Sequence, residues 1–237
     1  MHELLFTLAY EKGVDEYMDL FIEHNDLRAE AVYSCLDPSQ LWRLEVLTGD
    51  ASTLEAVTSL ALDESRGRES VSERSCEATR HHSLLTETGR RRVIYSYLSD
   101  VRRCDAVPVI TARYLSGGSL VKLTRRGAEA QWQILMQNDE KAGMLYDTLG
   151  SRLADGMQFH FGRVTEVDTW RNTMLAANTL PNEQRETLAL AVNEGYFETP
   201  REVTLDELAE QLDVPRSTVS YRLRRAVGEV VSNFVQD

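Results

Sequence analysis

Lysine is scarce in this chain of 237 residues, which has three lysines against 23 arginines. Acidic residues number 38 and are spread along the whole chain, giving a formal net charge of −12. At about 1 M salt the Debye length is roughly 3 Å, so repulsion between carboxylates is screened. A dense acidic surface then keeps a protein hydrated and soluble. The composition therefore favours a halophilic protein over an ordinary acidic one.

Long apolar runs are also missing, since no stretch approaches the roughly 20 residues that span a bilayer. No basic and apolar signal sequence opens the chain, so we expect a cytoplasmic protein that does not contact a membrane. The three cysteines, Cys35, Cys76 and Cys104, are odd in number and widely spaced, without a C-x-x-C pair. This pattern favours reduced thiols over a disulfide framework.

Motifs of catalysis are absent as well. The sequence contains no Walker loop, Rossmann glycines, nucleophile elbow or zinc-binding spacing, so we expect no enzyme, no catalytic residue and no cofactor. Cys76, His81, His82 and Cys104 are the one group with metal or redox chemistry in their side chains. Because His81 and His82 are neighbours on an expected strand, they point to opposite faces. Ordinary strand histidines and buried thiols are the favoured interpretation, and a metal or redox role is left open.

Residues 1–165 alternate between strand-like and helix-like patterns, which predicts an α+β domain. The order strand, helix, strand, strand, helix over residues 3–65 predicts a ferredoxin-like or ACT-like unit, completed by a strand near residues 79–87. Within it, residues 40–49 alternate apolar side chains with Arg43 and Glu45.

Further along, two strand-like stretches flank a Gly-Gly pair. Residues 107–115 and 119–125 are rich in apolar and β-branched side chains, and Gly117-Gly118 lies between them. Such a pair predicts a β-hairpin. Residues 166–180 are polar and predict a helical connector, and from residue 181 to 237 only helical patterns follow.

A helix-start signature opens the stretch "VTLDELAEQLDV". Thr204 and Glu207 have the spacing of a capping box, in which each side chain bonds a free backbone N–H of the helix end. The apolar residues after Thr204 recur at the spacing of one buried helical face. Asp213 marks the expected end, and a second helix begins near Pro215, whose missing N–H costs little in a first turn.

The second helix is basic, and residues 214–228 contain no carboxylate. Two short helices joined by a tight turn predict a helix-turn-helix, whose second helix enters the major groove of DNA. Arginine can bind guanine bidentately, and hydroxyl groups bond bases or phosphates. The residues expected to contact double-stranded DNA are Arg216, Ser217, Thr218, Ser220, Tyr221, Arg222, Arg224 and Arg225.

The stretches "GYFETPR", "TLDELAEQLDV" and "STVSYRLRRA" resemble the C-terminal helix-turn-helix of haloarchaeal regulators of the bacterio-opsin activator type. The likeness covers about fifty residues, and it implies a sequence-specific transcription regulator whose second helix reads bases. Asp213 stands where related motifs often place Gly, and Pro215 stands where Ser commonly caps the helix. Both differences concern the start of the expected recognition helix.

The role of residues 1–165 is open between two interpretations: sensing a small-molecule effector, or dimerisation. A homodimer suits a helix-turn-helix protein, because two recognition helices about 34 Å apart read successive major grooves. We therefore expect a regulatory and dimerisation domain at 1–165 and a trihelical DNA-binding domain at 181–237. The alternative is a ligand-binding or scaffold protein whose C-terminal helices bind another protein.

Overall fold

The chain forms two compact units, Met1–Asp168 and Thr169–Asp237. The computed structural model describes residues 1–65, 67, 70–115, 119–166 and 180–235. The predicted helical connector at residues 166–180 lies, apart from its end residues, outside this described part. No helix in the described part is long and apolar enough to cross a membrane.

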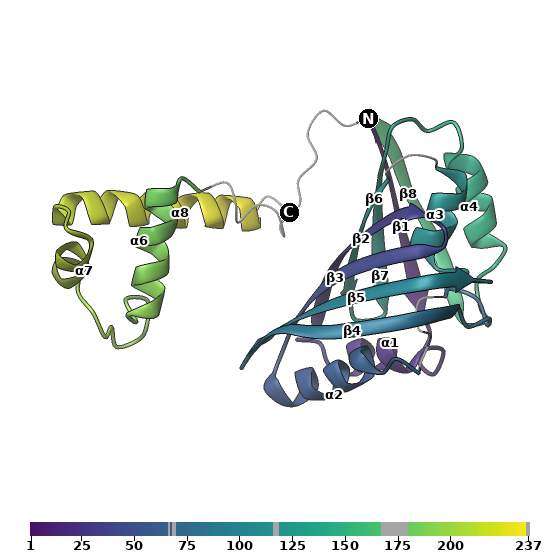
Figure 1. Ribbon diagram of the computed structural model, residues 1–237, viewed down its shortest axis with the longest axis horizontal. Helices are drawn as coiled ribbons and strands as arrows, with labels where there is room; N and C mark the ends of the chain where they lie inside the picture. Colours follow the sequence, from purple (N-terminus) through teal and green to yellow (C-terminus); the bar gives the residue numbers. More distant parts are fainter. Residues whose placement is uncertain (66, 68–69, 116–118, 167–179, 236–237) are drawn as a thin grey trace. The chain divides into compact units, whose positions relative to one another are not determined.

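The first unit is built on a single antiparallel sheet of eight strands, in the order β4-β5-β3-β2-β6-β7-β1-β8 (Figure 1). The strands are β1 (His2–Tyr10), β2 (Arg28–Asp37), β3 (Gln40–Thr48), β4 (Glu77–Thr88), β5 (Arg91–Arg102), β6 (Leu120–Arg126), β7 (Glu129–Met136) and β8 (Met157–Glu166). The helices are α1 (Glu16–Glu23), α2 (Ala51–Leu62), α3 (Val107–Tyr114) and α4 (Ala142–Gly150). The predicted α+β class is confirmed.

The element order β-α-β-β-α-β occurs twice, first from β1 to β4 and then from β5 to β8. The sheet order has a matching symmetry, because β4, β5, β3 and β2 correspond in turn to β8, β1, β7 and β6. Each half therefore places its first strand in the other half: β1 lies between β7 and β8, and β5 lies between β4 and β3. The unit predicted from residues 3–87 is consequently not a separate sheet, because its strand β1 pairs with β7 and β8 of the other half.

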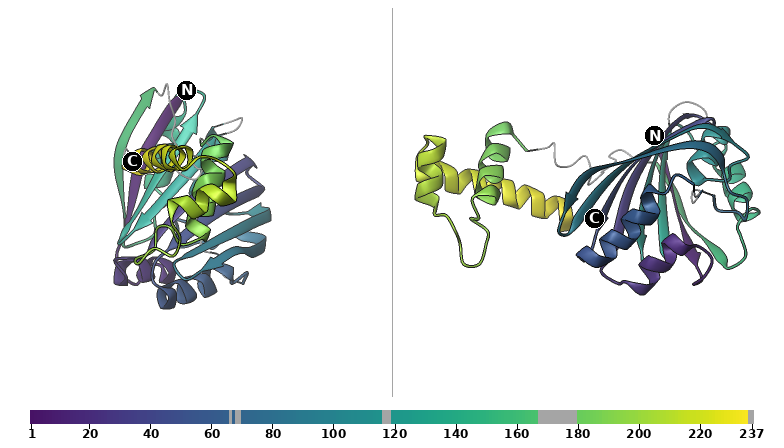
Figure 2. Two further views of the ribbon diagram at one scale, coloured as in Figure 1. Left: turned by 90° about the vertical axis from the view of Figure 1, so that its left-hand side faces the viewer. Right: turned by 60° about the horizontal axis from the view of Figure 1, so that its bottom comes forward.

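All four helices pack on the same face of the sheet. Ala29 and Tyr33 of β2 share that face, because side chains four residues apart on a strand point the same way. Ala29 belongs to the apolar cluster that includes Phe21 of α1 and Val57 of α2. Tyr33 belongs to a second cluster, with buried side chains of α3 and α4. Figure 2 shows the two helix pairs at separate places along the sheet.

Residues 107–114 form the helix α3, so the predicted strand at 107–115 is wrong. Pro108 lies in the first turn, where a missing N–H is tolerated. The fully or almost fully buried side chains include a set at helical spacing: Val107, Ile110 and Thr111. Their β-branched side chains favour strands, but packing against β2 and α4 decides the conformation. The hairpin predicted at Gly117-Gly118 lies outside the described residues.

The face of β3 that packs under the helices carries charge. Arg43 is 3% exposed and Glu45 is fully buried, whereas Leu44 between them is 38% exposed. Burial of a carboxylate is tolerated when it is paired and hydrogen-bonded, and Glu45 accepts a hydrogen bond from Arg125 of β6 at 2.8 Å. The alternation over residues 40–49 therefore predicts the strand correctly. The ion pair between Glu45 and Arg125 determines that the charged face of the strand is the buried one.

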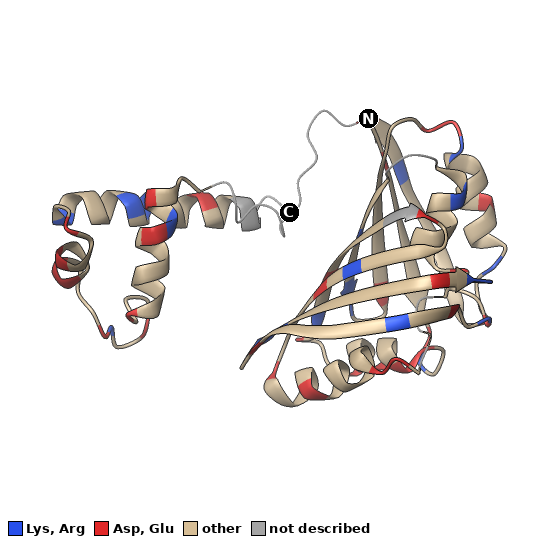
Figure 3. Cartoon of the chain, viewed as in Figure 1, with Lys and Arg blue, Asp and Glu red and all other residues tan. Residues whose placement is uncertain are grey.

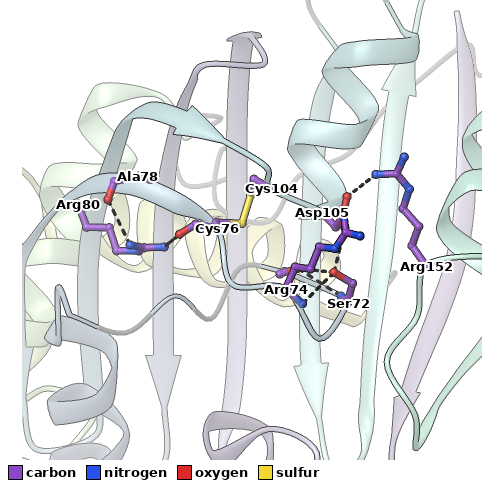
Figure 4. Close-up of a disulfide and its surroundings, with 9 residues drawn as sticks. Ser72, Arg74, Cys76, Ala78, Arg80, Cys104, Asp105 and Arg152 are labelled. Atoms are coloured by element: carbon purple, nitrogen blue, oxygen red, sulfur yellow. Dashed lines mark hydrogen bonds and ion pairs between the residues drawn. A yellow bond between two sulfur atoms is a disulfide. The ribbon is translucent and has the colours of Figure 1, made fainter.

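A disulfide joins Cys76 to Cys104, so the expectation of reduced thiols is wrong for this pair (Figure 4). The segment before β4 lies along the start of α3, where Val71 N–H donates to the Asp105 carbonyl at 3.1 Å. The Ser72 hydroxyl also donates to the Asp105 carboxylate at 2.9 Å. These bonds bring together two cysteines that lie 28 residues apart in sequence, a proximity that spacing alone does not reveal.

The two histidines point in different directions, as their positions on one strand require. His82 lies with Nδ1 2.9 Å from the Ser96 hydroxyl on the helix-covered face. His81 is exposed and lies 3.5 Å from a carboxylate oxygen of Glu64. Both Cys76 and Cys104 are occupied by their disulfide, and the described residues contain no group of three or more metal-binding side chains that could hold an ion.

Candidate nucleic-acid interface

The second unit contains three helices among its described residues: α6 (Asn182–Asn193), α7 (Leu205–Leu212) and α8 (Arg216–Val235). They meet around one small apolar core. Its fully or largely buried side chains are Ala191, Val203, Leu208, Ala209, Val219 and Leu223. The core fixes α7 and the first half of α8 against α6, which leaves one face of α8 to solvent.

The capping box predicted at the start of α7 is confirmed. The Thr204 hydroxyl accepts a hydrogen bond from the Glu207 N–H at 3.3 Å, and the Glu207 carboxylate accepts one from the Thr204 N–H at 2.7 Å. The backbone hydrogen bond from Thr204, together with its hydroxyl, lowers the pKa of Glu207 below its ordinary value. Two otherwise unpaired donors at the helix start are thereby satisfied.

The turn between α7 and α8 depends on Asp213. This residue ends α7 in the left-handed conformation, with φ 51° and ψ 44°. Two backbone bonds close the turn: Asp213 N–H donates to the Glu210 carbonyl and Val214 N–H to the Ala209 carbonyl. Glycine adopts this conformation without steric cost, and Asp is among the few other residues that tolerate it. The sequence difference at Asp213 therefore preserves the turn.

The outward face of α8 carries the residues predicted to bind DNA, and Figure 3 colours the arginines of this helix blue. Among them the exposed ones are Arg216, Ser217, Ser220, Tyr221, Arg224 and Arg225, and the partly exposed ones are Thr218 and Arg222. Opposite them, Val219 and Ala226 are fully buried. Eight positions between Arg216 and Arg225 thus present hydroxyl, aromatic and guanidinium groups around one side of the helix. Such a surface can donate hydrogen bonds to both phosphates and base edges.

Two of these arginines have carboxylate partners that local sequence patterns did not predict. Arg216 Nε lies 3.3 Å from the Asp206 carboxylate of α7, and both side chains are largely exposed. Arg222 donates to the Glu183 carboxylate of α6 at 2.6 Å, and its side chain is only 19% exposed. Glu183 and Arg222 are 39 residues apart, so only the folded bundle reveals that this pair ties α6 to α8.

The inward face of α6 includes one polar residue. Leu188 is partly buried and Ala191 fully buried, whereas the apolar Val192 is 59% exposed. Thr187 takes a buried place instead, and its hydroxyl donates to the Glu183 carbonyl at 2.7 Å. Bonding back to the preceding turn satisfies a hydroxyl inside a helix, which is why a polar residue fits there.

Comparison with protein families matches both units. A family described as HVO_2928_N, N-terminal, matches residues 3–170. A family described as HTH DNA binding domain matches residues 180–232, the segment that holds α6, α7 and most of α8. The second match confirms the predicted helix-turn-helix DNA-binding domain.

One curated relative is the dimethyl sulfoxide reductase transcriptional activator of Haloferax volcanii. It is 46% identical to this chain over 124 residues, which make up 52% of this chain and 49% of the relative. The similar stretch therefore spans about half the length of each protein. Together with the helix-turn-helix match, this relative confirms the resemblance to haloarchaeal helix-turn-helix regulators.

Proposed function

Because the chain belongs to the HVO_2928_N family and carries a C-terminal helix-turn-helix DNA-binding domain, we propose that it is a sequence-specific transcription regulator. The observation that carries the proposal is the outward face of α8, which has four guanidinium and four hydroxyl-bearing side chains between Arg216 and Arg225 and no carboxylate. The relative that is a transcriptional activator supports the same class. A regulator of this kind is not an enzyme.

We assign the base-reading role to the N-terminal part of α8, because the first turns of a recognition helix reach the base edges. Its residues are Arg216, Ser217, Thr218, Ser220 and Tyr221, with Arg222 beside them. Arg224 and Arg225 lie further along the helix, where they suit contacts with phosphates. To contact DNA, Arg216 must give up its exposed ion pair with Asp206. This costs little, since exposed ion pairs contribute about 0–1 kcal/mol.

A homodimer is the form in which we expect the regulator to bind. Each protomer offers one recognition helix, and two helices about 34 Å apart read successive major grooves. Supporting this proposal, Val230 and Val231 on the second half of α8 are 46% and 51% exposed, and a second copy of the helix would cover them. Light scattering on the full chain checks the mass, and Val230→Asp with Val231→Asp should shift it to that of a monomer.

The first unit, residues 1–165 in our proposed division, would be the regulatory domain of a cytoplasmic protein. We propose that its halves are ferredoxin-like units that exchange their first strands, which is supported by the repeated β-α-β-β-α-β order. The exchange makes the halves one structural body. A domain of this size also exceeds what a tether to DNA requires, so a sensing role for a small molecule fits it.

The proposed DNA contacts are tested by comparing two arginines at several salt concentrations. Arg216→Ala should reduce the preference for the operator over random DNA, with a loss of about 1–3 kcal/mol on the operator. Arg225→Ala should weaken binding to both DNAs alike and lower the salt slope by about 1, because it removes one phosphate contact. Chromosomal sites bound in vivo supply the operator sequence for fluorescence anisotropy.

The alternative is a scaffold protein whose C-terminal helices bind another protein. Competition discriminates between the two, since unlabelled operator should displace labelled operator at far lower concentration than random DNA. Equal competition by the two DNAs would reject sequence-specific reading. An equal loss on operator and random DNA for Arg216→Ala would reject the role assigned to that residue alone.

A further inference from the structure

A narrow polar cavity lies inside the first unit, on the face of the sheet that the helices cover. It has a volume of about 20 Å³, and its lining includes Arg125 of β6 and Trp132 of β7. The two strands pair so that Arg125 lies opposite Ala130 and Leu123 opposite Trp132. Arg125 and Trp132 are therefore diagonal neighbours on one face, within reach of a common small group.

Both of these side chains point an N–H group into buried space without an acceptor. Trp132 is 4% exposed and Arg125 is 8% exposed. Among the described residues, Trp132 Nε1 and Arg125 Nε have no hydrogen-bond partner. A buried donor left unpaired costs about 1–3 kcal/mol, so two such donors on residues that line one cavity favour an oxygen acceptor there.

The rest of the lining includes the phenol of Tyr10 and one carboxylate, Asp15, which accepts a hydrogen bond from the Met18 N–H at 2.7 Å. Burial raises the pKa of Tyr10 above its ordinary value, partly opposed by Arg125, so its phenol remains an O–H donor at neutral pH. Burial works to lower the pKa of Arg125, but Tyr33 and Glu45 raise it and the net shift is upward. Arg125 is therefore a permanent cation, held by Glu45 at 2.8 Å and stacked over the Tyr17 ring at 5.4 Å.

A wider cleft of about 420 Å³ adjoins the cavity, and its lining includes Arg74 as well as the carboxylates Glu73 and Asp155. The two share lining residues, which are Tyr10, Asp15, Ser70 and Val71. This volume lies in the range of pockets that hold small molecules. One wall is the serine-rich segment at residues 70–75, which hydrogen bonds to Asp105 and the adjacent Cys76–Cys104 disulfide hold in place (Figure 4).

We propose that the cavity and cleft bind a small organic carboxylate. Its carboxylate oxygens accept from Trp132 Nε1 and Arg125 Nε, and its polar body lies along the serines of the 70–75 segment. Hydrogen bonds between an ionised donor and a carboxylate are about twice as strong as neutral ones, which favours the acid over a neutral carbonyl compound. The assignment of this ligand as an effector rests on the proposed function, whereas its binding does not.

The test titrates the full chain, at constant KCl, with pyruvate, gluconate and benzoate, each paired with its neutral amide. At a hundredfold excess over Kd, a bound acid should raise the melting temperature by about 5 °C or more, and its amide should not. Trp132→Phe keeps the ring but removes the donor, and it should weaken binding about 10- to 100-fold. Calorimetric titration measures that change.

Trp42→Phe is the matched control, because it makes the same chemical change on the opposite face of the sheet. Trp42 stacks on Tyr97 at 5.6 Å and lines neither the cavity nor the cleft. Binding in this variant should equal that of the wild type. Equal losses in Trp132→Phe and Trp42→Phe would overturn the site.

Three other results would also overturn the proposal: no acid in the panel raises the melting temperature, the amides bind as well as the acids, or chloride and phosphate bind as well as the acids. Operator binding is measured on the same samples. Operator binding without carboxylate binding refutes this site alone. Carboxylate binding without operator binding refutes the proposed function and leaves the site standing.

Discussion

Arg125 and Glu45 are joined across a strand that lies between them. Arg125 Nη1 lies 2.8 Å from Glu45 Oε1, although β2 separates β6 from β3. The residues of β2 beside them are Ala29, opposite Arg125, and Ala31, opposite Glu45. Both alanines are buried, and their short side chains leave the space through which the guanidinium reaches the carboxylate. The pair thus depends on small residues in a third strand.

Removing this carboxylate should be costly. Glu45→Met leaves buried guanidinium groups without their partner, and breaking a buried ion pair costs about 3–5 kcal/mol. Glu23→Met removes the Lys12–Glu23 pair, whose side chains are 64% and 45% exposed, and it should cost far less because solvent screens an exposed ion pair. Urea denaturation at fixed KCl measures both variants. Similar losses in the two would contradict the structural role of Glu45.

The disulfide should be detectable by thiol counting and by stability. The unfolded, unreduced protein should expose one thiol, from Cys35, and the reduced protein three. Reduction, or Cys76→Ser with Cys104→Ser, should lower the free energy of unfolding by about 2–4 kcal/mol, because the cross-link restricts the unfolded chain. Cys35→Ser serves as the control. Three reactive thiols without reductant would show that the bond does not form in solution.

The left-handed turn at Asp213 should respond to side-chain shape. Asp213→Val places a β-branched side chain at φ 51°, and it should destabilise the second unit by about 1–2 kcal/mol. Asp213→Gly adopts this conformation freely and should fold at least as well as wild type. Thermal unfolding and operator binding of the two variants provide the comparison. A Val variant as stable as the Gly variant would mean that the turn differs in solution.

The capping box should make stability depend on acid pH. Because folding lowers the pKa of Glu207, its carboxylate stabilises the folded state above the unfolded pKa, and this contribution is lost as the pH falls through the lowered value. The melting temperature of Glu207→Gln should therefore lie below that of wild type at neutral pH, and the difference should shrink as the pH falls through the lowered pKa of Glu207. Glu210→Gln on the same helix is the control. A difference that stays constant as the carboxylates become protonated would exclude this linkage.

The helix-turn-helix could be predicted from sequence because its signals are local. The capping box, the apolar stripe of α7 and the buried positions Val219, Leu223 and Ala226 all lie within about 25 residues and agree with one another. Each depends on the period of a helix or on the bonding of its end. The exposed face of α8 follows as soon as the buried face is known.

The first unit was less predictable because its decisive contacts are remote in sequence. The stretch that forms α3 has the composition of a strand, and only packing against β2 and α4 makes it a helix. The buried face of β3 depends on Arg125, 80 residues beyond Glu45. No local sequence signal reveals that β1 and β5 are exchanged between the halves. The reason is that the alternation of buried and exposed side chains in each strand would suit either half of the sheet.

The sequence by itself determined the class of nearly every strand and helix, the helix-turn-helix and the basic face of its second helix. These features arise from periodicity, capping and charge within single segments. Tertiary structure alone decided which strands are neighbours, that Cys76 meets Cys104, and that Arg125 and Trp132 share one buried cavity. The physical reason is that burial and electrostatic pairing act between segments brought together only by folding.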